Sequence, residues 1–335
     1  MEILKQFAQD AKKLNGTVIL AEGDEERTIE AAVKLVKDGI ARVIAVAPTQ
    51  DMIREAAKKK NLDISGVTLL TPELGQLDPA VLDEFVKRMI AKGISEEDAK
   101  NRAKDPLMFS ALYLKSGKAS GGVAGARAST PDVLRAAIHG IGTAPGTKIV
   151  SSFFLMVPPA EHPLVKKPII YADCGVNPDP SAAGLRDIAI ASVSSFRSLF
   201  PGETPKVAFL SFSTKGSAEH RMLQKVLDAV KMTREYFAGD PSVLVDGELQ
   251  FDAAAVPAVG KKKAPDSPVA GQANIFIFPD LNAGNICYKV TERLGGFAAI
   301  GPLLQGLSRP LNDLSRGCNS DDIYYAAVVA LLKSK

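Results

Sequence analysis

The sequence has few cysteines and few histidines, and neither type forms a recognisable site. The three cysteines, Cys174, Cys287 and Cys318, are widely separated, which is neither a disulfide framework nor a metal-ligand spacing. The three histidines also lack the spacing of metal ligands. A reduced, cytoplasmic setting is the simplest interpretation of this cysteine usage.

Long apolar runs and a strong charge of one sign are also missing. No uninterrupted apolar run reaches the length that spans a membrane. The N-terminus has the pattern of an amphipathic helix rather than that of a signal peptide. A net charge of +3 is small for 335 residues, so bulk charge does not indicate nucleic-acid binding. We expect neither nucleic acid nor membrane as a partner.

Several common catalytic motifs are absent. There is no Walker A sequence, no Gly-x-Ser-x-Gly elbow and no His-Glu-x-x-His. Gly140, Gly142 and Gly146 miss the dinucleotide-binding spacing by one residue, so a Rossmann site is not supported. Arginines near glycine-rich turns are plentiful instead, and they suit anionic ligands that carry phosphate or carboxylate.

Length and periodicity predict two α/β domains. A chain of 335 residues exceeds what one core usually serves, and 46% apolar residues are ample for packed cores. Short apolar runs at 17–21, 43–47 and 67–70 alternate with helical patterns at 28–38 and 52–60. This alternation is typical of a parallel sheet flanked by helices.

A second set of elements follows a glycine- and proline-rich stretch near residue 145. In the second domain we expect strands at 149–155, 168–172, 206–211 and 274–278. We expect helices there at 182–199, 217–238 and 285–294. Residues 258–268, with three lysines among prolines, are expected to form a mobile loop. The predicted domains are 1–148 with 302–335, and an inserted domain at 149–301. A small-ligand site is expected in the cleft between them.

Residues 119–130 are unusually small, and Ser129-Thr130-Pro131 starts a helix that continues through Arg135. Small residues let the backbone approach another group closely. Hydroxyls and N–H groups at a helix start can bind an anion. A tight strand–helix turn explains the same pattern equally well.

The polar run at 301–322 precedes an apolar, buried helix at 323–332. Asn319, Ser320 and Asp321 are the N-cap candidates. Such a place suits a fixed arginine beside a fixed carboxylate. A capped helix with a surface ion pair carries about equal weight, because caps are common.

The run Gly-Pro-x-x-Gln-Gly-Leu-x-x-Pro-x-Asn-Asp-Leu-Ser-Arg-Gly, which starts at Gly301, resembles the C-terminal signature of the phosphate acetyl/butyryltransferase family, most closely of its phosphate acetyltransferases. Four earlier stretches match the same family in order, so the resemblance covers nearly the whole chain. They lie at residues 171–178, 209–218, 245–254 and 278–294.

The resemblance implies reversible transfer of an acetyl group between coenzyme A and inorganic phosphate. Coenzyme A, acetyl-CoA, acetyl phosphate and phosphate would be substrates, with no tightly bound cofactor and no metal bound by the protein. It also implies a homodimer with two mostly parallel sheets in each subunit. This fold is similar to that of the isocitrate and isopropylmalate dehydrogenases, with the site in the interdomain cleft.

Acyl transfer to or from a thiol requires a base and a group that stabilises negative charge, and the matching residues include candidates for both. A thiol must lose its proton before it attacks, a carboxylate can remove that proton, and a cation can stabilise the charge on the acyl oxygen. The resemblance assigns Asp322 as the base, Arg316 as the group that polarises the carbonyl, and Ser315 as a hydrogen-bonding partner near thiol or phosphate. The expected substrate and coenzyme A residues are Arg293, Arg135, Arg88, Ser129, Thr130, Asn282 and Cys174.

Some assignments stay open. The match around Arg88 is loose, so Lys87 competes with it, and Asp321 competes with Asp322. Cys174 is expected to pack or control access, because direct thiolate attack needs no acyl-enzyme. Ala136, Gly175 and Arg127 depart from the family pattern, and these departures bear on acyl-chain preference.

Three other functions are weighed against acetyl transfer. Butyryl transfer is an alternative on the same scaffold. A metal-dependent decarboxylating dehydrogenase would need a metal site, for which adjacent aspartates 321–322 are the one hint. A non-catalytic binding module is disfavoured because Arg316 and Asp322 are both retained.

Overall fold

The computed structural model describes residues 2–334, which divide into two compact units. The terminal unit consists of Glu2–Pro145 and the segment that begins at Leu307, and the central unit is Gly146–Gly306. Each unit contains one sheet flanked by helices, which confirms the predicted α/β class. Among the described residues, no helix combines the length and apolarity needed to cross a membrane.

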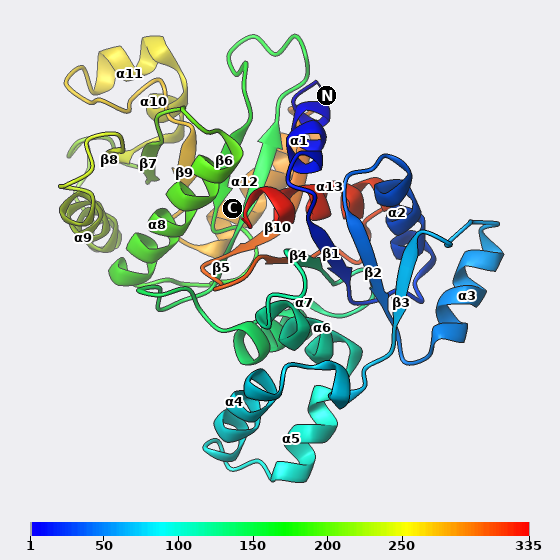
Figure 1. The fold of residues 1–335 in the computed structure, drawn as a ribbon. Helices are drawn as coiled ribbons and strands as arrows, with labels where there is room; N and C mark the ends of the chain where they lie inside the picture. Colours follow the sequence, from blue (N-terminus) through cyan, green and yellow to red (C-terminus); the bar gives the residue numbers. More distant parts are fainter. Residues whose placement is uncertain (1, 335) are drawn as a thin grey trace. The chain divides into compact units, whose positions relative to one another are not determined.

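The sheet of the terminal unit is entirely parallel, in the order β11-β4-β1-β2-β3. Parallel neighbours need long crossover connections, and helices supply them here. The strands are β1 Thr17–Leu20, β2 Arg42–Val46, β3 Val67–Leu70, β4 Gly121–Val123 and β11 Leu311–Asn312. The helices are α1 Glu2–Lys12, α2 Glu26–Lys37, α3 Gln50–Lys59, η1 Leu74–Gln76, α4 Pro79–Ile90, α5 Glu96–Ala103, α6 Pro106–Lys115, α7 Thr130–Ala136, η2 Ala137–Ile141 and α13 Ser320–Leu332. Helices α4 and α5 pack on each other and on α6, at the end of the unit drawn in cyan (Figure 1).

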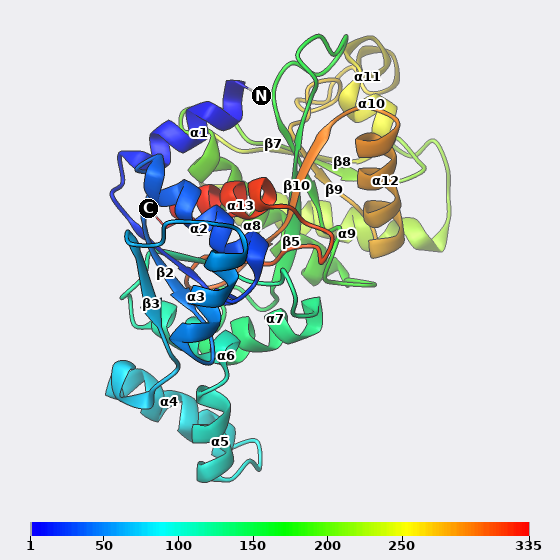
Figure 2. The ribbon, with the colours of Figure 1, turned by 90° about the vertical axis from the view of Figure 1, so that its right-hand side faces the viewer.

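Helix α13 is the buried helix of the terminal unit. It packs against α1, α2 and strand β4, and Figure 2 shows it in red beside both helices. A Cβ on Gly121 would lie 2.8 Å from the Ala330 Cβ, so only glycine lets strand and helix approach this closely. The Asn312 amide donates to the Ala326 carbonyl at 2.8 Å, which fixes β11 to the same helix. The small residues of 119–130 are therefore explained in part by this close packing.

The central unit has a mixed sheet in the order β10-β5-β6-β9-β7-β8. Its β6, β9, β7 and β8 run parallel, whereas β5 pairs antiparallel with both β6 and β10. The strands are β5 Ser151–Val157, β6 Ile169–Ala172, β7 Lys206–Leu210, β8 Leu244–Leu249, β9 Ile275–Ile277 and β10 Ala298–Gln305. The helices are α8 Ala182–Leu199, α9 Arg221–Tyr236, α10 Phe251–Ala255, α11 Pro257–Lys263 and α12 Leu281–Arg293.

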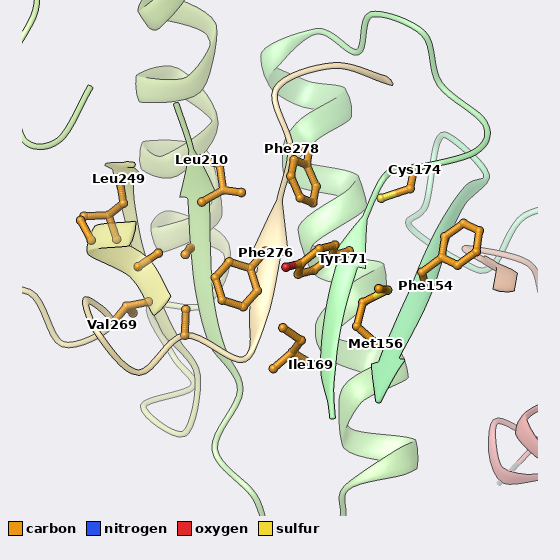
Figure 3. Packing of buried hydrophobic residues seen from close by; sticks show 14 of the residues in the cluster. Phe154, Met156, Ile169, Tyr171, Cys174, Leu210, Leu249, Val269, Phe276 and Phe278 are labelled. Carbon is orange, nitrogen blue, oxygen red and sulfur yellow. The ribbon is translucent and has the colours of Figure 1, made fainter. Parts of the chain in front are cut away.

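An aromatic cluster forms much of the core on one face of this sheet. The Tyr171 ring makes edge contacts with the rings of Phe276 and Phe278, at centroid distances of 5.5 and 5.2 Å (Figure 3). Cys174, just beyond β6, belongs to the same buried cluster. Aromatic edge contacts of this kind add to the stabilisation from burial alone.

One expectation about the central unit is wrong in part. Residues 258–263 of the expected loop are helical, because helix α11 covers Pro257–Lys263, whereas 264–268 lie outside any helix or strand. Its Lys263 is anchored to Asp252 at 2.9 Å and to Gln250 at 2.9 Å, and Pro257 occupies the first helical turn. Proline is well tolerated there, since that N–H has no partner within the helix. The lysine run thus belongs to the last turn of a helix, where cations are favoured.

Candidate functional site

The entry to α13 is built as a capping box. Asn319 is the N-cap, and its side-chain oxygen accepts from the Asp322 N–H at 3.0 Å. In return, the Asp322 Oδ2 accepts from the Asn319 N–H at 2.9 Å. Among the three cap candidates the structure therefore selects Asn319. Asp322 is half-buried, and its own part in the cap holds its side chain in place.

The neighbouring Asp321 has a different environment. It is exposed, and its carboxylate pairs with the Lys34 ammonium of α2 at 2.5 Å. This hydrogen bond raises the pKa of Lys34 above its ordinary value. The two adjacent carboxylates thus have different partners. Asp321 pairs with Lys34 of α2, and Asp322 accepts the hydrogen bond from the N-cap backbone.

Ser315 and Arg316 lie on the exposed loop just before α13. The Ser315 carbonyl accepts from the Cys318 N–H at 2.9 Å, and its hydroxyl oxygen accepts from the Gly317 N–H at 3.3 Å. These bonds form a tight turn at 315–318. The Arg316 side chain is exposed, and the carbonyl of the same residue accepts from Arg27 at 2.9 Å.

Asp313, three residues before Arg316, is buried and links this loop to α7. The Thr130 hydroxyl donates to its Oδ2 at 2.7 Å. Burial raises the pKa of Asp313 to about 6, because the charged form loses solvation that hydrogen bonds from the Thr130 hydroxyl and the Leu314 backbone only partly replace. Thr130, predicted to bind substrate, therefore has an acceptor within the protein.

Helix α7 carries two more of the predicted residues. Ser129 is its N-cap, and the Ser129 hydroxyl donates to the Asp132 carboxylate at 2.6 Å. Arg135 lies on the exposed side and donates to the other oxygen of Asp132 at 2.7 Å. These bonds lower the pKa of Asp132, with Ser129 as the largest cause and Arg135 the next. The helix start is thus satisfied largely by its own side chains.

A cavity of about 570 Å³ lies within the terminal unit, between the 125–128 loop and helices α4 to α7. Arg135, predicted from the sequence, is among its lining residues. The lining residues are Ala21, Glu22, Met89, Arg102, Asp105, Pro106, Leu107, Met108, Arg127, Ala128, Asp132, Arg135, Ala136 and His139. Its volume falls in the range of small-molecule sites.

Positive charge gathers around His139 at this cavity. Burial lowers the pKa of His139, and nearby Lys92, Arg88, Arg135 and Arg102 lower it further. The Lys92 ammonium lies 3.0 Å from the His139 Nε2. A neutral imidazole surrounded by cations is an arrangement that an anionic ligand would stabilise.

Arg88 and Lys87 differ in their surroundings. Arg88 is half-buried, acts on His139, and lies 3.7 Å from the Glu84 carboxylate. Its Nε is buried without a hydrogen-bond partner among the described residues. Lys87 is exposed. The geometry thus favours Arg88 over Lys87 as the residue that faces the basic cluster.

The sequence did not indicate three members of this cluster, Lys92, Arg102 and His139. Lys92 and Arg102 are exposed charged residues near helix ends, which usually means solvation alone. His139 lies in the π-helical segment that follows α7, and its pattern matches no ligand motif. Only the tertiary fold reveals their proximity.

The remaining predicted residues lie in the central unit. The Cys174 carbonyl accepts from the Asn285 amide of α12 at 3.1 Å, and Gly284 lets that helix pack closely on residues 173–174. The same helix carries Asn282, which is exposed, and Arg293, whose side chain is 79% exposed. Burial raises the pKa of the Cys174 thiol well above its ordinary value. A buried, protonated thiol is a poor nucleophile, in agreement with a packing role.

Among residues 2–334, no group of three or more His, Cys, Asp and Glu side chains is arranged so that it could hold a metal ion.

The chain is similar to one protein family over nearly its whole length. The family model described as "Phosphate acetyl/butaryl transferase" matches residues 2–331. The phosphate acetyltransferase of Clostridium acetobutylicum is 41% identical over 335 residues, which covers 100% of this chain and 99% of the relative. That of Thermoanaerobacterium thermosaccharolyticum is 44% identical over 323 residues, 96% of each chain.

Solved structures agree with these relatives. A phosphotransacetylase from Staphylococcus aureus superposes with a TM-score of 0.89 at 38% identity, covering 100% of this chain and 98% of that one. A 4-hydroxythreonine-4-phosphate dehydrogenase from Klebsiella pneumoniae has a TM-score of 0.56 at 11% identity, covering 96% and 100%. The second likeness concerns the fold alone, and it agrees with the predicted similarity to dehydrogenase-like folds.

The full-length matches define the class of protein as an acyltransferase enzyme. More narrowly, the chain belongs to the phosphate acetyl/butyryl transferase family.

Proposed function

We propose that the chain transfers an acetyl group reversibly between coenzyme A and inorganic phosphate, converting acetyl-CoA and phosphate to acetyl phosphate and CoA. Full-length relatives at 41% and 44% identity, both named phosphate acetyltransferase, support this reaction. The observation that carries it within the structure is the basic cluster at the cavity of the terminal unit, which suits a phosphorylated substrate.

In the proposed chemistry, the coenzyme A thiol attacks the carbonyl carbon of acetyl phosphate directly. Asp322 takes the thiol proton, a C–S bond forms, and the C–O bond to phosphate breaks, so that phosphate leaves with the bonding electrons. A carboxylate can act as such a general base once it lies within hydrogen-bond reach. Its place in the capping box supports the role, because the box fixes the Asp322 side chain and engages Oδ2 alone in the cap.

Arg316 stabilises the negative charge that develops on the acyl oxygen, and Ser315 donates a hydrogen bond to thiol or phosphate. The tight turn at 315–318 supports this assignment, since a fixed backbone limits the positions that the two side chains can take. A preorganised cation contributes most where its orientation needs no rearrangement during reaction.

Arg88 and Arg135 bind phosphate groups of coenzyme A or the inorganic phosphate. Their joint influence on His139 supports a shared anionic ligand, and Lys92 and Arg102 add to the same field. The exposed guanidinium of Arg135 could turn from Asp132 toward a phosphate, because an exposed ion pair is worth only about 0–1 kcal/mol. Ser129 and Thr130 then act mainly by holding α7 in position.

Helix α12 of the central unit supplies the other proposed contacts. Arg293, at its C-terminal end, would meet the 3′-phosphate or pyrophosphate of coenzyme A. Its guanidinium is 79% exposed and lies 3.4 Å from the Glu292 carboxylate, a contact that it would exchange for the phosphate. Asn282 would contribute a polar contact, and Cys174 would pack beneath the helix. A homodimer and a cytoplasmic setting remain predictions from the family resemblance and the cysteine usage.

The proposal is tested by measuring CoA release from acetyl-, propionyl- and butyryl-CoA side by side, with phosphate and a metal chelator present. We expect the highest kcat/KM with acetyl-CoA and no loss of rate on chelation. A preference for butyryl-CoA would support the butyryltransferase alternative. Activity that required metal and a nicotinamide cofactor would support the dehydrogenase alternative, and both outcomes would contradict acetyl transfer.

A further inference from the structure

Residues 22–27, which form the turn after β1 and the first residues of α2, contact two loops of the terminal unit. At the start of this segment, the buried Glu22 carboxylate accepts four backbone N–H groups, from residues 125 to 128, at 2.6 to 3.1 Å. A carboxylate enclosed by successive backbone N–H groups holds that loop in one conformation, since hydrogen bonds to a charged acceptor are stronger than neutral ones.

In the first turn of α2, Arg27 binds three backbone carbonyls at once. One terminal nitrogen donates to the carbonyls of Arg316 at 2.9 Å and Cys318 at 2.8 Å. The other donates to the carbonyl of Ala126 at 2.8 Å. Its Nε donates to Glu25 at 2.9 Å, which fixes the orientation of the guanidinium plane. Arg27 therefore joins the 125–128 loop, which borders the cavity, to the 315–318 turn.

Two of the carbonyls that accept from Arg27 belong to residues at or next to the proposed catalytic groups. One belongs to Arg316 itself, the proposed oxyanion-stabilising residue. The other belongs to Cys318, directly before the Asn319 N-cap whose box holds Asp322. Without these bonds, the 315–318 turn would lose its side-chain link to α2 and, through Arg27, to the 125–128 loop.

We propose that Arg27 is a positioning residue for the acyl transfer, because it fixes the backbone of Arg316 and Cys318 relative to the cavity loop. This inference rests on the proposed function and adds a residue to it. Arg27 does not touch substrate in this role. Lysine cannot replace it, since a single ammonium on a flexible stem does not present donors in a planar fork. A small misplacement of catalytic groups can cost about 100-fold in rate.

The test uses the full-length variants Arg27→Ala, Arg27→Gln and Arg27→Lys, with Arg54→Ala as the matched control. Arg54 is an exposed arginine of α3 that pairs with Asp51 at 2.8 Å and touches neither loop. We expect kcat to fall about 10- to 100-fold in each Arg27 variant, with the KM for coenzyme A and phosphate changed less than about threefold. Added guanidinium should restore part of the kcat of Arg27→Ala, whereas ammonium at equal ionic strength should not. The control should keep native values.

Circular dichroism and thermal unfolding of each variant establish how much of it is folded. An unchanged kcat in folded Arg27→Ala or Arg27→Gln overturns the inference. So does a loss of activity that merely equals the unfolded fraction, or one that guanidinium fails to restore in the folded variant. Native chain without acetyl transfer would instead overturn the proposed function, so the two failures are distinguishable.

Discussion

Replacement of Asp322 separates the cap of α13 from the chemistry of the site, because the two depend on different properties of one carboxylate. In the native protein the Asp322 carboxylate accepts from the Asn319 N–H at 2.9 Å. Asp322→Asn keeps an oxygen that can accept this bond but removes the base. Asp322→Ala removes both. Asn319→Ala removes the N-cap oxygen that accepts from the Asp322 N–H at 3.0 Å and keeps the carboxylate.

The expected stability changes follow from the capping box. Loss of the Asn319 side chain should cost about 1 kcal/mol, as is usual for an N-cap replaced by alanine. Loss of the Asp322 carboxylate should cost about 0.5–1 kcal/mol from the helix dipole and the cap bond together. For a chain of this size, each kcal/mol lowers Tm by roughly 1–2 °C. Asp322→Asn should therefore unfold close to the native temperature, while the two alanine variants unfold slightly below it.

The expected turnover follows a different order. General-base catalysis typically contributes about 100- to 10,000-fold, so Asp322→Asn and Asp322→Ala should both lose at least about 100-fold in kcat. The KM for coenzyme A should change little. Asn319→Ala should lose less than about tenfold, because its carboxylate remains. The assay follows CoA thiol release from acetyl-CoA and phosphate with a thiol-reactive chromophore, beside a thermal melt of each variant. Comparable kcat values for Asp322→Asn and native enzyme, or an effect on KM alone, would refute the assignment of the base.

Three further predictions concern other parts of the chain. Arg293→Ala should raise the KM for coenzyme A about tenfold with kcat nearly unchanged, since an exposed guanidinium would then be lost from phosphate binding; an unaltered KM would remove that assignment. Burial raises the pKa of Asp313 from 3.8 to about 6, so this carboxyl binds a proton more tightly in the folded protein than in the unfolded chain. Its contribution to stability is therefore present below about pH 4 and is lost between pH 4 and 6. Asp313→Asn should remove this slope and raise the free energy of unfolding at pH 7 by up to about 3 kcal/mol. Denaturant unfolding at pH 4, 5, 6 and 7 that kept the native slope would contradict this prediction. Cys174→Ala should keep native kcat within about twofold and lose about 1 kcal/mol of stability, because the thiol packs and does not react; loss of turnover in the folded variant would assign it a chemical role.

Much of the fold was predictable because periodicity and local stops act over short distances. The apolar runs at 17–21, 43–47 and 67–70 became β1, β2 and β3, since β-rich runs between helical patterns have few other arrangements in an α/β domain. Strand β4 was not predicted, because Gly121 and Gly122 have poor strand propensity and are there for close packing against α13 and β11. Propensity cannot reveal a packing partner about 200 residues away in the chain.

The site was predictable to a smaller extent. The polar run before α13 indicated a capped helix start, but three cap candidates were equivalent until the backbone selected Asn319. The basic cluster depends on α4, α5 and the segment after α7 folding together around His139, which no local pattern encodes. Arg27 is likewise an unremarkable first-turn arginine in the sequence. Its bonds to carbonyls at 126, 316 and 318 exist only in the folded terminal unit.

Direct transfer between sulfur and phosphate, without an acyl-enzyme, is tested by isotope exchange. Native enzyme is incubated with acetyl phosphate and labelled inorganic phosphate, first without coenzyme A and then with it. Direct attack predicts that no label enters acetyl phosphate until coenzyme A is added. Label incorporated in its absence would reveal an acetylated enzyme and contradict the proposed mechanism.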